Sequence, residues 1–596
     1  MKARNTLILL VLAAGLFCYM RFYETNQPTT QEAVEQSGHV LDLDTGSIDG
    51  ISITNNETRI ELRKRDQQWQ MDAPVKDRAD DAAVSQLIST ADGLQKETSL
   101  TPDSGKVDLR ELGLSRPNVT LQFHGQDGLP EILFGKDTAI DGQEYLRLGN
   151  SNDVFVVPAD LRTQVTKAVD EFREHRLSDV APTQVTQFDI QTPAGEIEMD
   201  KLQDHWVINN PIKARGDDAK ISDLLAQTLN TRIASFVSSD QAGAANTALN
   251  DPAGTISVTA EGEAKPVQLL LSKAIDKDTG KVYGKLSTRD AALVLPGAVA
   301  STLLTKPADV RDRHLIRLDL DTVDRIHILP AGAPEILLAR KGEDWTIKSL
   351  NDRPANGGAV QTMADALRNQ LVSSFVSDVA TELPKYGLDH PRLKITFSSY
   401  ASDNTAETKA GEEPLESVLI GATDGDNVFA KLDDEPFIVS VPKSVIDTIH
   451  ADPLQWQALS IYQLKPDDIV AMQVTSPGQG PLSLVKAKGQ WKPAKGDIAV
   501  NSDNIQSIAN TLATLRALEW AGPAQPAQGL DKPAVTITFT TADQQTHTVT
   551  VGAASGDYWY ASALGAQGTF LISHPDHDTL VAPILPTAAP AGTPGK

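Results

Sequence analysis

A short stretch near the C-terminus, "SHPDHD", holds the residues best suited to chemistry. His574, Asp576, His577 and Asp578 offer imidazole nitrogens and carboxylate oxygens, which are ligands for transition metals. The corresponding stretches of three similar segments, "VVPADL", "VLPGAV" and "SVPKSV", contain no histidine. Two close histidines also lack the additional fixed ligands that a zinc site needs. An exposed turn between a strand and a helix explains the stretch, and we predict no metal site.

Other motifs with potential chemistry resemble turns and helix ends more than active sites. "AGEIEMD" (194–200) and "DKDTGK" (276–281) are acidic but lack the ligand order of an EF-hand. "IGATDGDN" (420–427) resembles a turn, because no Gly-Lys-Ser/Thr of a phosphate loop follows it. We interpret "REHR" (173–176) and "RDRH" (311–314) as basic residues on exposed helix ends. Basic side chains near a helix C-terminus interact favourably with the helix dipole.

The motifs of well-known enzyme classes are missing from the sequence. It contains no G-x-S-x-G elbow, no H-E-x-x-H pair and no G-x-G-x-x-G fingerprint. An active site could still be built from dispersed residues, because catalytic triads are defined by geometry and not by sequence position. We assign no catalytic, cofactor-binding or metal-binding residues, and we predict a protein that is not an enzyme and has no cofactor.

Four tryptophans mark a repeat that organises the chain. Their spacings are 137, 139 and 146 residues, and each is followed at a matching offset by an apolar residue that opens a helical pattern. The pairs are Trp69 with Val84, Trp206 with Ile221, Trp345 with Val360, and Trp491 with Ile505. An aromatic residue at one offset from a helix suits packing, so we predict that the tryptophans anchor the cores. The alternative is an exposed aromatic platform for a sugar or peptide.

A second landmark follows each predicted helix and introduces strands. It reads "GLSRP", "ALNDP", "GLDHP" and "GLDKP", and its proline ends one element and launches another. Gly113, Gly387 and Gly529 could supply a positive φ, whereas Ala248 in the second copy requires a different turn, or no positive φ there. Alternating segments such as "VTLQFH" then predict half-buried strands, and the last of them closes on a proline, as at Pro158, where a helix could begin.

Each copy therefore predicts a hairpin, a helix, a loop, about four antiparallel strands and a closing helix. This is an α+β unit, a mostly antiparallel sheet covered by helices. A period of about 140 residues indicates whole domains in tandem and not a solenoid. The predicted organisation is a signal anchor or transmembrane helix (1–23), a linker (24–46), four repeats (47–177, 178–315, 316–460 and 461–586) and a disordered tail (587–596).

Composition narrows the class of protein. The chain has 596 residues, enough for several cores, and a formal net charge of -25 that is spread along its length. That charge disfavours binding to nucleic acid through phosphates, so no nucleic-acid partner is predicted. The single cysteine, Cys18, lies in the N-terminal apolar run, so the body has no disulfide and no thiolate metal site.

The N-terminus carries a targeting signal. Lys2 and Arg4 precede the apolar run "TLILLVLAAGLFCYM", and Arg21 follows it. The run suits a signal-peptide core or a short spanning helix, but no small-x-small cleavage site closes it. An uncleaved anchor fits better than a cleaved signal or a buried core helix, and the positive N-terminus then places the body outside the cytoplasm. We predict a single-pass protein of a bacterial inner membrane with its body in the periplasm or another extracytoplasmic space.

The chain resembles the bacterial family named domain of unknown function 4340. The resemblance rests on the anchor, on the tryptophan segments "WQMDAPV" and "WVINNPI", on the GLxxP landmark and on the VxxVP ending, and it covers nearly all the chain after residue 47. The second copy, with Ala248, and the fourth, with "WKPAKGD", depart from these marks. The resemblance implies a membrane-anchored extracytoplasmic protein that works beside the permease and ATPase of an ABC-type transporter, and it supplies no catalytic residues.

Two classes of function remain open at this point. The first is a non-catalytic scaffold or accessory subunit that extends from the transporter and holds a partner or a polymer. The second is an extracytoplasmic hydrolase or ligand-binding protein with a site between repeats, where clefts commonly form. A deep cleft lined by convergent carboxylates or histidines would favour the second class, and shallow convex surfaces would favour the first.

Overall fold

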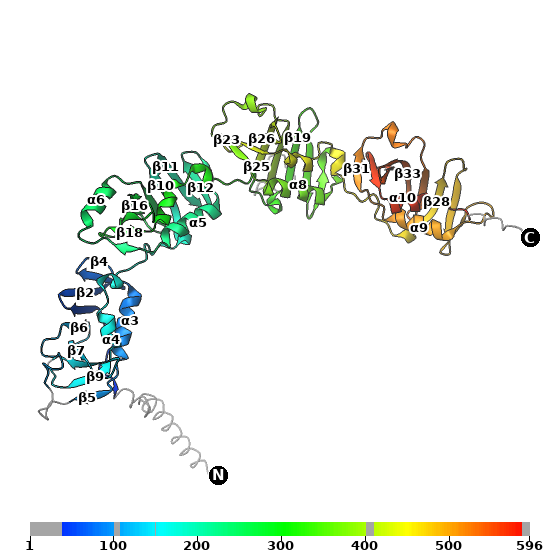
Figure 1. Cartoon of the computed structure of the whole chain (residues 1–596). Helices are drawn as coiled ribbons and strands as arrows, with labels where there is room; N and C mark the ends of the chain where they lie inside the picture. Colours follow the sequence, from blue (N-terminus) through cyan, green and yellow to red (C-terminus); the bar gives the residue numbers. More distant parts are fainter. Residues whose placement is uncertain (1–37, 101–107, 150, 401–410, 587–596) are drawn as a thin grey trace, which may run out of the picture. The chain divides into compact units, whose positions relative to one another are not determined.

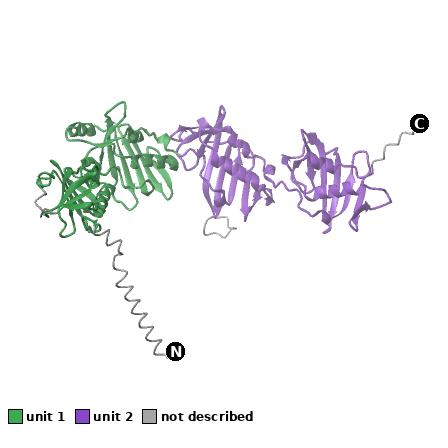
Figure 2. Cartoon of the chain, turned by 60° about the horizontal axis from the view of Figure 1, so that its bottom comes forward, with its two compact units in different colours: residues 1–311 green, residues 312–596 purple. Residues whose placement is uncertain are grey.

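The computed structural model describes residues 38–100, 108–149, 151–400 and 411–586. It comprises two compact units, Met1–Arg311 and Asp312–Lys596 (Figure 2). The predicted anchor, most of the predicted linker and the predicted C-terminal tail lie outside the described residues. Among the described residues, no helix has the length and apolar character needed to cross a membrane.

Four antiparallel sheets follow one another along the chain, two in each unit (Figure 1). The first has nine strands in the order β4-β3-β2-β1-β6-β7-β8-β9-β5. Its elements are β1 (Gly50–Asn55), β2 (Thr58–Arg65), β3 (Gln68–Ala73), β4 (Asp77–Arg78), α3 (Asp81–Asp92), β5 (Thr98–Leu100), β6 (Val119–His124), β7 (Ile132–Asp137), β8 (Gln143–Leu148), β9 (Val154–Pro158) and α4 (Asp160–Val165).

The second sheet repeats this strand order as β13-β12-β11-β10-β15-β16-β17-β18-β14. Its elements are β10 (Val185–Thr192), β11 (Gly195–Leu202), β12 (His205–Asn210), β13 (Ala214–Arg215), α5 (Asp218–Leu229), β14 (Ser235–Phe236), α6 (Ala242–Asn250), β15 (Gly254–Ala260), β16 (Val267–Ala274), β17 (Val282–Leu286), β18 (Leu293–Leu295) and α7 (Gly297–Ala300).

The second unit contains the third and fourth sheets, and the fourth lacks the short strand that precedes the helix in the other three. The third repeat consists of β19 (Arg325–Pro330), β20 (Ile336–Lys341), β21 (Asp344–Ile347), β22 (Arg353–Pro354), α8 (Gly357–Asn369), β23 (Ser374–Ser377), β24 (Leu393–Tyr400), β25 (Glu412–Asp424), β26 (Asn427–Leu432), β27 (Ile438–Pro442) and the 3₁₀ helix η10 (Lys443–Thr448). The fourth consists of β28 (Ile469–Thr475), β29 (Leu482–Ala487), β30 (Gln490–Pro493), α9 (Ser502–Ala513), β31 (Glu519–Gly522), β32 (Val535–Thr541), β33 (Thr546–Ser555), β34 (Tyr558–Ala563), β35 (Thr569–Ile572) and α10 (His574–Leu580).

Four mostly antiparallel sheets in repeated units are therefore confirmed, and the described part of the chain contains more sheet than expected. Each tryptophan lies on a third strand, which follows the predicted hairpin. Short edge strands such as β4 and β5 were not predicted, because two or three residues are too few to display an alternating pattern. The closing helix is also shorter than predicted in the second and third repeats, where 3₁₀ turns replace much of it.

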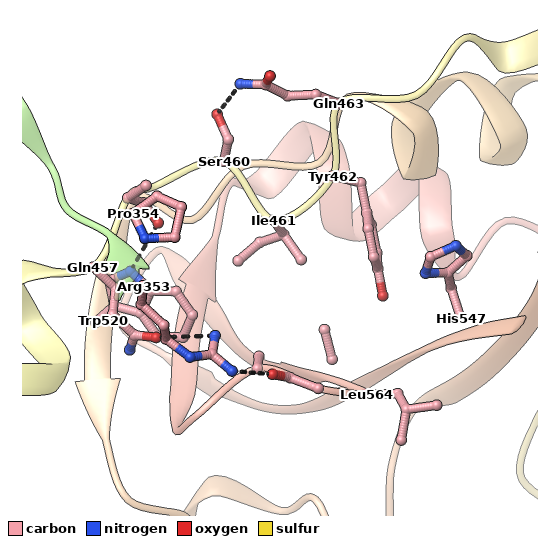
Figure 3. Close-up of a pocket in the computed structure, with 14 residues that line it drawn as sticks. Arg353, Pro354, Gln457, Ser460, Ile461, Tyr462, Gln463, Trp520, His547 and Leu564 are labelled. Carbon is pink, nitrogen blue, oxygen red and sulfur yellow. Dashed lines mark hydrogen bonds between the residues drawn. The ribbon is translucent and has the colours of Figure 1, made fainter. Parts of the chain in front are cut away.

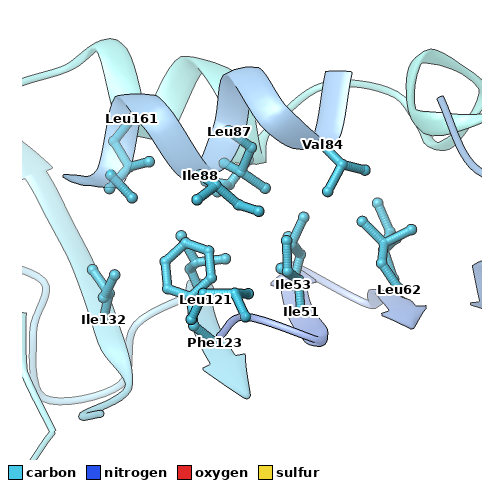
Figure 4. Packing of buried hydrophobic residues seen from close by; sticks show 14 of the residues in the cluster. Ile51, Ile53, Leu62, Val84, Leu87, Ile88, Leu121, Phe123, Ile132 and Leu161 are labelled. Carbon is cyan, nitrogen blue, oxygen red and sulfur yellow. The ribbon is translucent and has the colours of Figure 1, made fainter. Parts of the chain in front are cut away.

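The long helix of each repeat packs its apolar stripe onto one face of its sheet. In the first repeat, Val84, Leu87 and Ile88 point from α3 onto strand residues such as Ile53 and Leu121 (Figure 4). Polar caps start these helices, because the side chains of the N-cap residues accept backbone hydrogen bonds from the first turn. These residues are Asp80, Asp217, Asn356 and Asn501.

The four tryptophans belong to the cores, as predicted. Trp69, Trp206, Trp345 and Trp491 are between 2% and 6% exposed. The apolar residues that open the four helices are fully buried, as are the strand residues beneath α3. An aromatic platform for sugar or peptide is therefore wrong for these positions, because their rings already lie inside the protein.

The glycine landmark packs against a glycine in the second strand that follows it. Gly113, Gly387 and Gly529 have φ values of 77°, 64° and 66°. The turns that contain Gly387 and Gly529 cross directly over Gly421 and Gly552, and a Cβ on either strand glycine would lie 2.2 Å from a backbone oxygen of the turn. Both glycines of each pair are needed because two backbones touch there.

The second repeat has a different structure at the position of the glycine landmark. Ala248 lies within helix α6, so no positive φ is required there. The strand position that is glycine in the other copies is Ser272, whose side chain accepts a hydrogen bond from the Tyr283 amide at 2.9 Å. The sequence left open either a different turn or no need for a positive φ in this copy, and the structure shows that a helix replaces the turn.

The close approach of the Gly387 turn to Gly421 leads to a stability prediction for the second unit. Gly421→Ala is expected to lower the free energy of unfolding by about 1–3 kcal/mol, because its Cβ would clash with the Tyr386 carbonyl oxygen. Gly480→Ala is the control, since a Cβ at Gly480 meets nothing within 4 Å. Chemical denaturation of both variants measures the difference, and equal stabilities would show that the two backbones move apart without cost.

Candidate ligand pocket between the third and fourth repeats

A pocket of about 590 Å³ lies where β22 of the third repeat meets the fourth sheet, within the second unit (Figure 3). The chain that connects the two repeats forms one side, and the turn between β34 and β35 forms another. Its principal lining residues are Arg353, Gln457, Tyr462, Trp520, His547 and Leu564.

The polar groups on the β22 side are already occupied by the protein. Arg353 donates to the Gly565 carbonyl oxygen and, at 3.4 Å, to Gln457 Oε1. The amide of Gln457 donates to the Gln567 carbonyl oxygen at 2.9 Å, and Trp520 Nε1 donates to the Ala458 carbonyl oxygen at 3.2 Å. These bonds attach the third repeat to the fourth and leave few donors on this side for a ligand.

Tyr462 and His547 line the other side of the pocket. The Tyr462 ring extends from the connecting chain toward Leu564 (Figure 3), and its hydroxyl is buried without a hydrogen-bond partner among the described residues. His547 stacks on Phe539 with ring centroids 5.0 Å apart and meets the Tyr462 ring edge-on at 5.0 Å. Burial raises the pKa of Tyr462 to about 12.

This arrangement suits binding better than acid-base catalysis. A phenol with a pKa this far above neutrality is a poor proton donor in a reaction. No carboxylate occurs among the described lining residues, and Ser460 accepts a hydrogen bond from Gln463 at 3.2 Å. A ligand that fits would be largely apolar and would carry one hydrogen-bond acceptor for the Tyr462 hydroxyl.

The unpaired Tyr462 hydroxyl leads to a prediction about the stability of the unliganded protein. Tyr462→Phe is expected to raise the free energy of unfolding of the second unit by roughly 1 kcal/mol, because it removes a buried group that has no partner. Tyr560→Phe is the control, since Ser555 donates to that hydroxyl at 3.3 Å and its loss should not stabilise. Denaturant titration compares them, and destabilisation by Tyr462→Phe would mean that the hydroxyl has a partner in solution.

The equivalent place in the first unit is closed by buried charges. Asp77 on β4 is the counterpart of Arg353 on β22, because each lies two residues before an alanine that bridges to the chain leaving its repeat. Asp77 binds Arg173 at 2.6 Å and Arg289, from the turn after β17, at 2.9 Å. Both side chains of the Asp77–Arg289 pair are at most 1% exposed. Opposite charges therefore replace the pocket between the first two repeats.

The interpretation of "REHR" and "RDRH" as exposed helix ends was wrong for their first residues. Arg173 is 5% exposed and Arg311 is 3% exposed. Each lies where the chain leaves its own repeat and forms a β-bridge with Ala79 or Gly216, so it is turned into the protein. The equivalent position in the third repeat is Gln457, which forms a β-bridge with Ala355.

The "SHPDHD" stretch begins helix α10. The structure brings the ligand atoms of His574, His577 and Asp578 within 4.8 Å of one another. Asp576 has a different role, since Ser573 Oγ donates to its carboxylate at 2.6 Å and accepts from its amide at 3.2 Å. The pair Ser573 and Asp576 therefore caps the helix.

The motifs at 276–281 and 420–427 form turns in the structure, whereas residues 195–200 of "AGEIEMD" belong to strand β11. Asp276 accepts hydrogen bonds from the Asp278 amide and from Thr279 Oγ1 in the turn between β16 and β17. Residues 420–427 form the end of β25 and its hairpin turn, with Gly425 at a φ of 62°, which confirms the turn.

Sequence reasoning missed a buried carboxyl group in the first repeat. Glu144 on β8 is 0% exposed. It alternates along the strand with buried Leu146, so the period-two pattern was a signal that this position faces the interior.

The family model described as Domain of unknown function (DUF4340) matches residues 69–205, 206–352 and 345–533. The three matches begin at Trp69, Trp206 and Trp345, so each starts on the third strand of one sheet and continues into the next repeat. The unit of the family model is therefore offset from the folding unit. Among curated proteins, none matches the chain.

Proposed function

The chain belongs to the domain of unknown function 4340 family, and from that premise we propose that it is a non-catalytic, membrane-anchored extracytoplasmic scaffold. In this proposal residues 1–23 hold it in a bacterial inner membrane, and the four repeats extend outside the cytoplasm. It acts as an accessory subunit beside the permease and ATPase of an ABC-type transporter, where it holds a partner.

The observation that carries the proposal is that the backbone contact at the joint between repeats recurs among the copies, whereas the side chains two residues before it do not. The chain leaving a repeat forms a β-bridge with the residue before the helix N-cap in each of the first three repeats: Ala79 with Arg173, Gly216 with Arg311, and Ala355 with Gln457. At the equivalent position two residues earlier stand Asp77, Ala214 and Arg353, which differ in charge and size. Repeats that carried out the same reaction would share the polar residues of that reaction. Repeats that act as spacers need to share only the contacts that connect one repeat to the next.

The N-terminal sequence and the charge support the membrane part of the proposal. Lys2 and Arg4 before the apolar run favour a cytoplasmic N-terminus. A body with a net charge of -25 and no cysteine after Cys18 is well hydrated and insensitive to oxidation, which suits an extracytoplasmic protein.

The test is crosslinking of the full chain in intact membranes. After solubilisation, the protein is captured through a tag on its C-terminal tail, and the proteins that come with it are identified. We expect a permease and an ATPase in stoichiometric amounts. The control replaces residues 1–23 with a cleavable signal, which distinguishes partners bound by the body from those that share only the membrane.

Recovery of the protein alone would contradict the proposal, provided that a known complex is captured under the same conditions. Recovery of partners only with the native anchor would restrict the contact to the membrane segment.

A ligand-binding function is the second candidate, because of the pocket beside Tyr462 and His547. A library of small apolar compounds can be screened by thermal shift against the full chain and Tyr462→Phe. Compounds that stabilise the native chain by several degrees and lose this effect in Tyr462→Phe would support it. An absence of such compounds would favour the scaffold alone.

A further inference from the structure

Three side chains on the first turns of α10 converge on one point. Asp578 Oδ1 lies 2.9 Å from His577 Nδ1 and 3.5 Å from His574 Nδ1. Around a metal ion with ligand bonds of 2.0–2.2 Å, neighbouring ligand atoms are separated by about 3.0–3.5 Å in octahedral or tetrahedral geometry. The Asp578 oxygen, which is hydrogen-bonded to His577 Nδ1, thus lies at about such separations from both nitrogens, and all three residues have ligand atoms within 4.8 Å of one another.

The helix explains why these three residues meet and why Asp576 does not join them. Positions 574, 577 and 578 are three and four residues apart, so they share one face of α10. Asp576 is directed to the cap formed with Ser573, which fixes the start of the helix. The donor set is thus two imidazoles and one carboxylate, a combination that suits zinc, copper and nickel and not magnesium or calcium.

A neighbouring strand holds the two imidazole rings in place. Trp559 on β34 stacks on His574 and His577 with centroid distances of 5.0 and 4.0 Å, and both interplanar angles are 15°. The indole restricts both rings, so less rotational freedom is lost when they bind an ion. Trp559 lies well before the helix in the sequence, so the motif "SHPDHD" alone does not display this support.

The cluster is open on one side. The His577 side chain is 15% exposed, whereas those of His574 and Asp578 are 65% and 59% exposed. Three protein ligands with solvent access leave a coordination position for water or for a group on another molecule, unlike a closed structural zinc site.

We propose that His574, His577 and Asp578 form a binding site for a late first-row divalent metal ion, Ni²⁺, Cu²⁺ or Zn²⁺. The site belongs to the fourth repeat alone, because the equivalent stretches of the other repeats contain no histidine. It is independent of the proposed scaffold function and gives one repeat a surface that the others lack.

The test is titration of the full chain, without a histidine tag, with CuCl₂ and ZnCl₂. Calorimetry measures stoichiometry and affinity, and quenching of tryptophan fluorescence by Cu²⁺ reports proximity to Trp559. We expect one saturable site, with Cu²⁺ bound more tightly than Zn²⁺. His577→Ala and Asp578→Asn should each weaken binding at least about tenfold, since even loss of a supporting group around a metal costs that much.

Two control variants separate a built site from binding to any exposed histidine. His390→Ala removes a histidine that is 95% exposed and lies 3.9 Å from Asp389, and it should leave the affinity unchanged. Trp559→Phe should keep the one-site stoichiometry in calorimetry and abolish most of the saturable quenching. Circular dichroism tests whether each variant is folded. If an alanine variant does not fold, Asp578→Asn still tests the proposal, because asparagine preserves the shape of the side chain.

The proposal is overturned if no saturable binding is observed up to about 1 mM metal, a concentration corresponding to about -4 kcal/mol of binding free energy. It is also overturned if the double variant His574→Ala/His577→Ala binds as tightly as the native chain, or if Mg²⁺ competes equally with Zn²⁺.

Discussion

Replacing Asp77 by alanine is expected to lower the free energy of unfolding of the first unit by about 3–5 kcal/mol, the cost of breaking a buried ion pair by removing one partner. Asp77 accepts two hydrogen bonds from Arg173 at 2.6 and 2.8 Å, and two from Arg289 at 2.9 Å. Without the carboxylate, two guanidinium groups would remain buried with one charge partner fewer. The loss is larger than for most single substitutions.

Further contacts hold both arginines inside the protein after the substitution. Arg289 also donates to the Glu174 carbonyl oxygen at 3.1 Å, and the Arg173 guanidinium lies 3.5 Å from the centre of the Phe236 ring. Phe236 and Arg289 come from the second repeat, whereas Asp77 and Arg173 come from the first. The substitution should therefore destabilise both repeats together.

The pH dependence of this cluster has a definite sign. Burial alone would raise the pKa of Asp77, but the hydrogen bonds and charges of Arg289 and then Arg173 outweigh it and hold the pKa below 3.8. A carboxyl group with a depressed pKa contributes stability above its unfolded pKa and loses it as the pH falls. The contribution is thus complete at neutral pH, begins to decrease at about pH 4 and is lost as the pH falls through the lower pKa of the folded state.

Urea denaturation of the full chain, followed by probes in both repeats, measures the effect. Asp72→Ala is the matched control, because Asp72 forms an exposed ion pair with Arg65 at 2.7 Å, which should be worth less than about 1 kcal/mol. A double-mutant cycle of Asp77 with Arg289 tests coupling between repeats. Equal effects of Asp77→Ala and Asp72→Ala would refute the cluster's contribution.

Glu144→Gln is expected to stabilise the first unit at alkaline pH by an amount on the order of 4 kcal/mol. The Glu144 carboxyl group is fully buried, and neither oxygen makes a hydrogen bond of normal geometry among the described residues. Arg162 Nη1 is 3.5 Å from Glu144 Oε2 and donates to Asp137 at 2.8 Å. The charge of Glu144 is therefore poorly compensated.

Burial raises the pKa of Glu144 from 4.5 to about 8, although the Arg162 charge opposes the shift. A raised pKa means that the folded state binds the proton more tightly than the unfolded state does. The stabilisation is fully present below about pH 4.5 and is lost as the pH rises to about 8. Glutamine cannot ionise, so the variant lacks this loss.

Denaturation curves of the native chain and Glu144→Gln between pH 4 and pH 9 test this prediction. Their difference isolates Glu144 from other groups such as Asp189, whose pKa is raised to about 6 by burial and by neighbouring carboxylates including Glu198. Glu131→Gln, an exposed change in the same repeat, should show no such trend. If the difference in unfolding free energy does not change with pH, folding does not raise the pKa of Glu144, and the prediction is wrong.

The predicted repeat was correct because local patterns encode it. Val84, Leu87, Ile88 and Ala91 lie on one face of α3, as their spacing of three and four residues requires. The alternating residues of β6 face the core and the solvent in turn, as period two requires. Such patterns depend on neighbours within a few residues, so a single sequence is sufficient to read them.

The pocket and the buried charges could not be predicted in the same way. Asp77 and Arg289 are 212 residues apart, and so are Arg353 and Gly565. No periodic pattern connects residues at that distance, so the partners of Asp77 and Arg353 are defined only when the chain is folded. The candidate metal site is intermediate, since helical spacing aligns its three ligands but only the sheet brings Trp559 onto the two imidazoles.

The sequence by itself determined the number of repeats, their strands and helices, and the tryptophan cores, because side-chain periodicity and burial are local properties of the chain. Only the tertiary structure decided how one repeat meets the next within each unit, since the closing contacts join a short strand of one repeat to a turn in the following one. At those contacts the burial of a charge depends on residues from both repeats. The ion pairs therefore contribute to stability only when both repeats are folded.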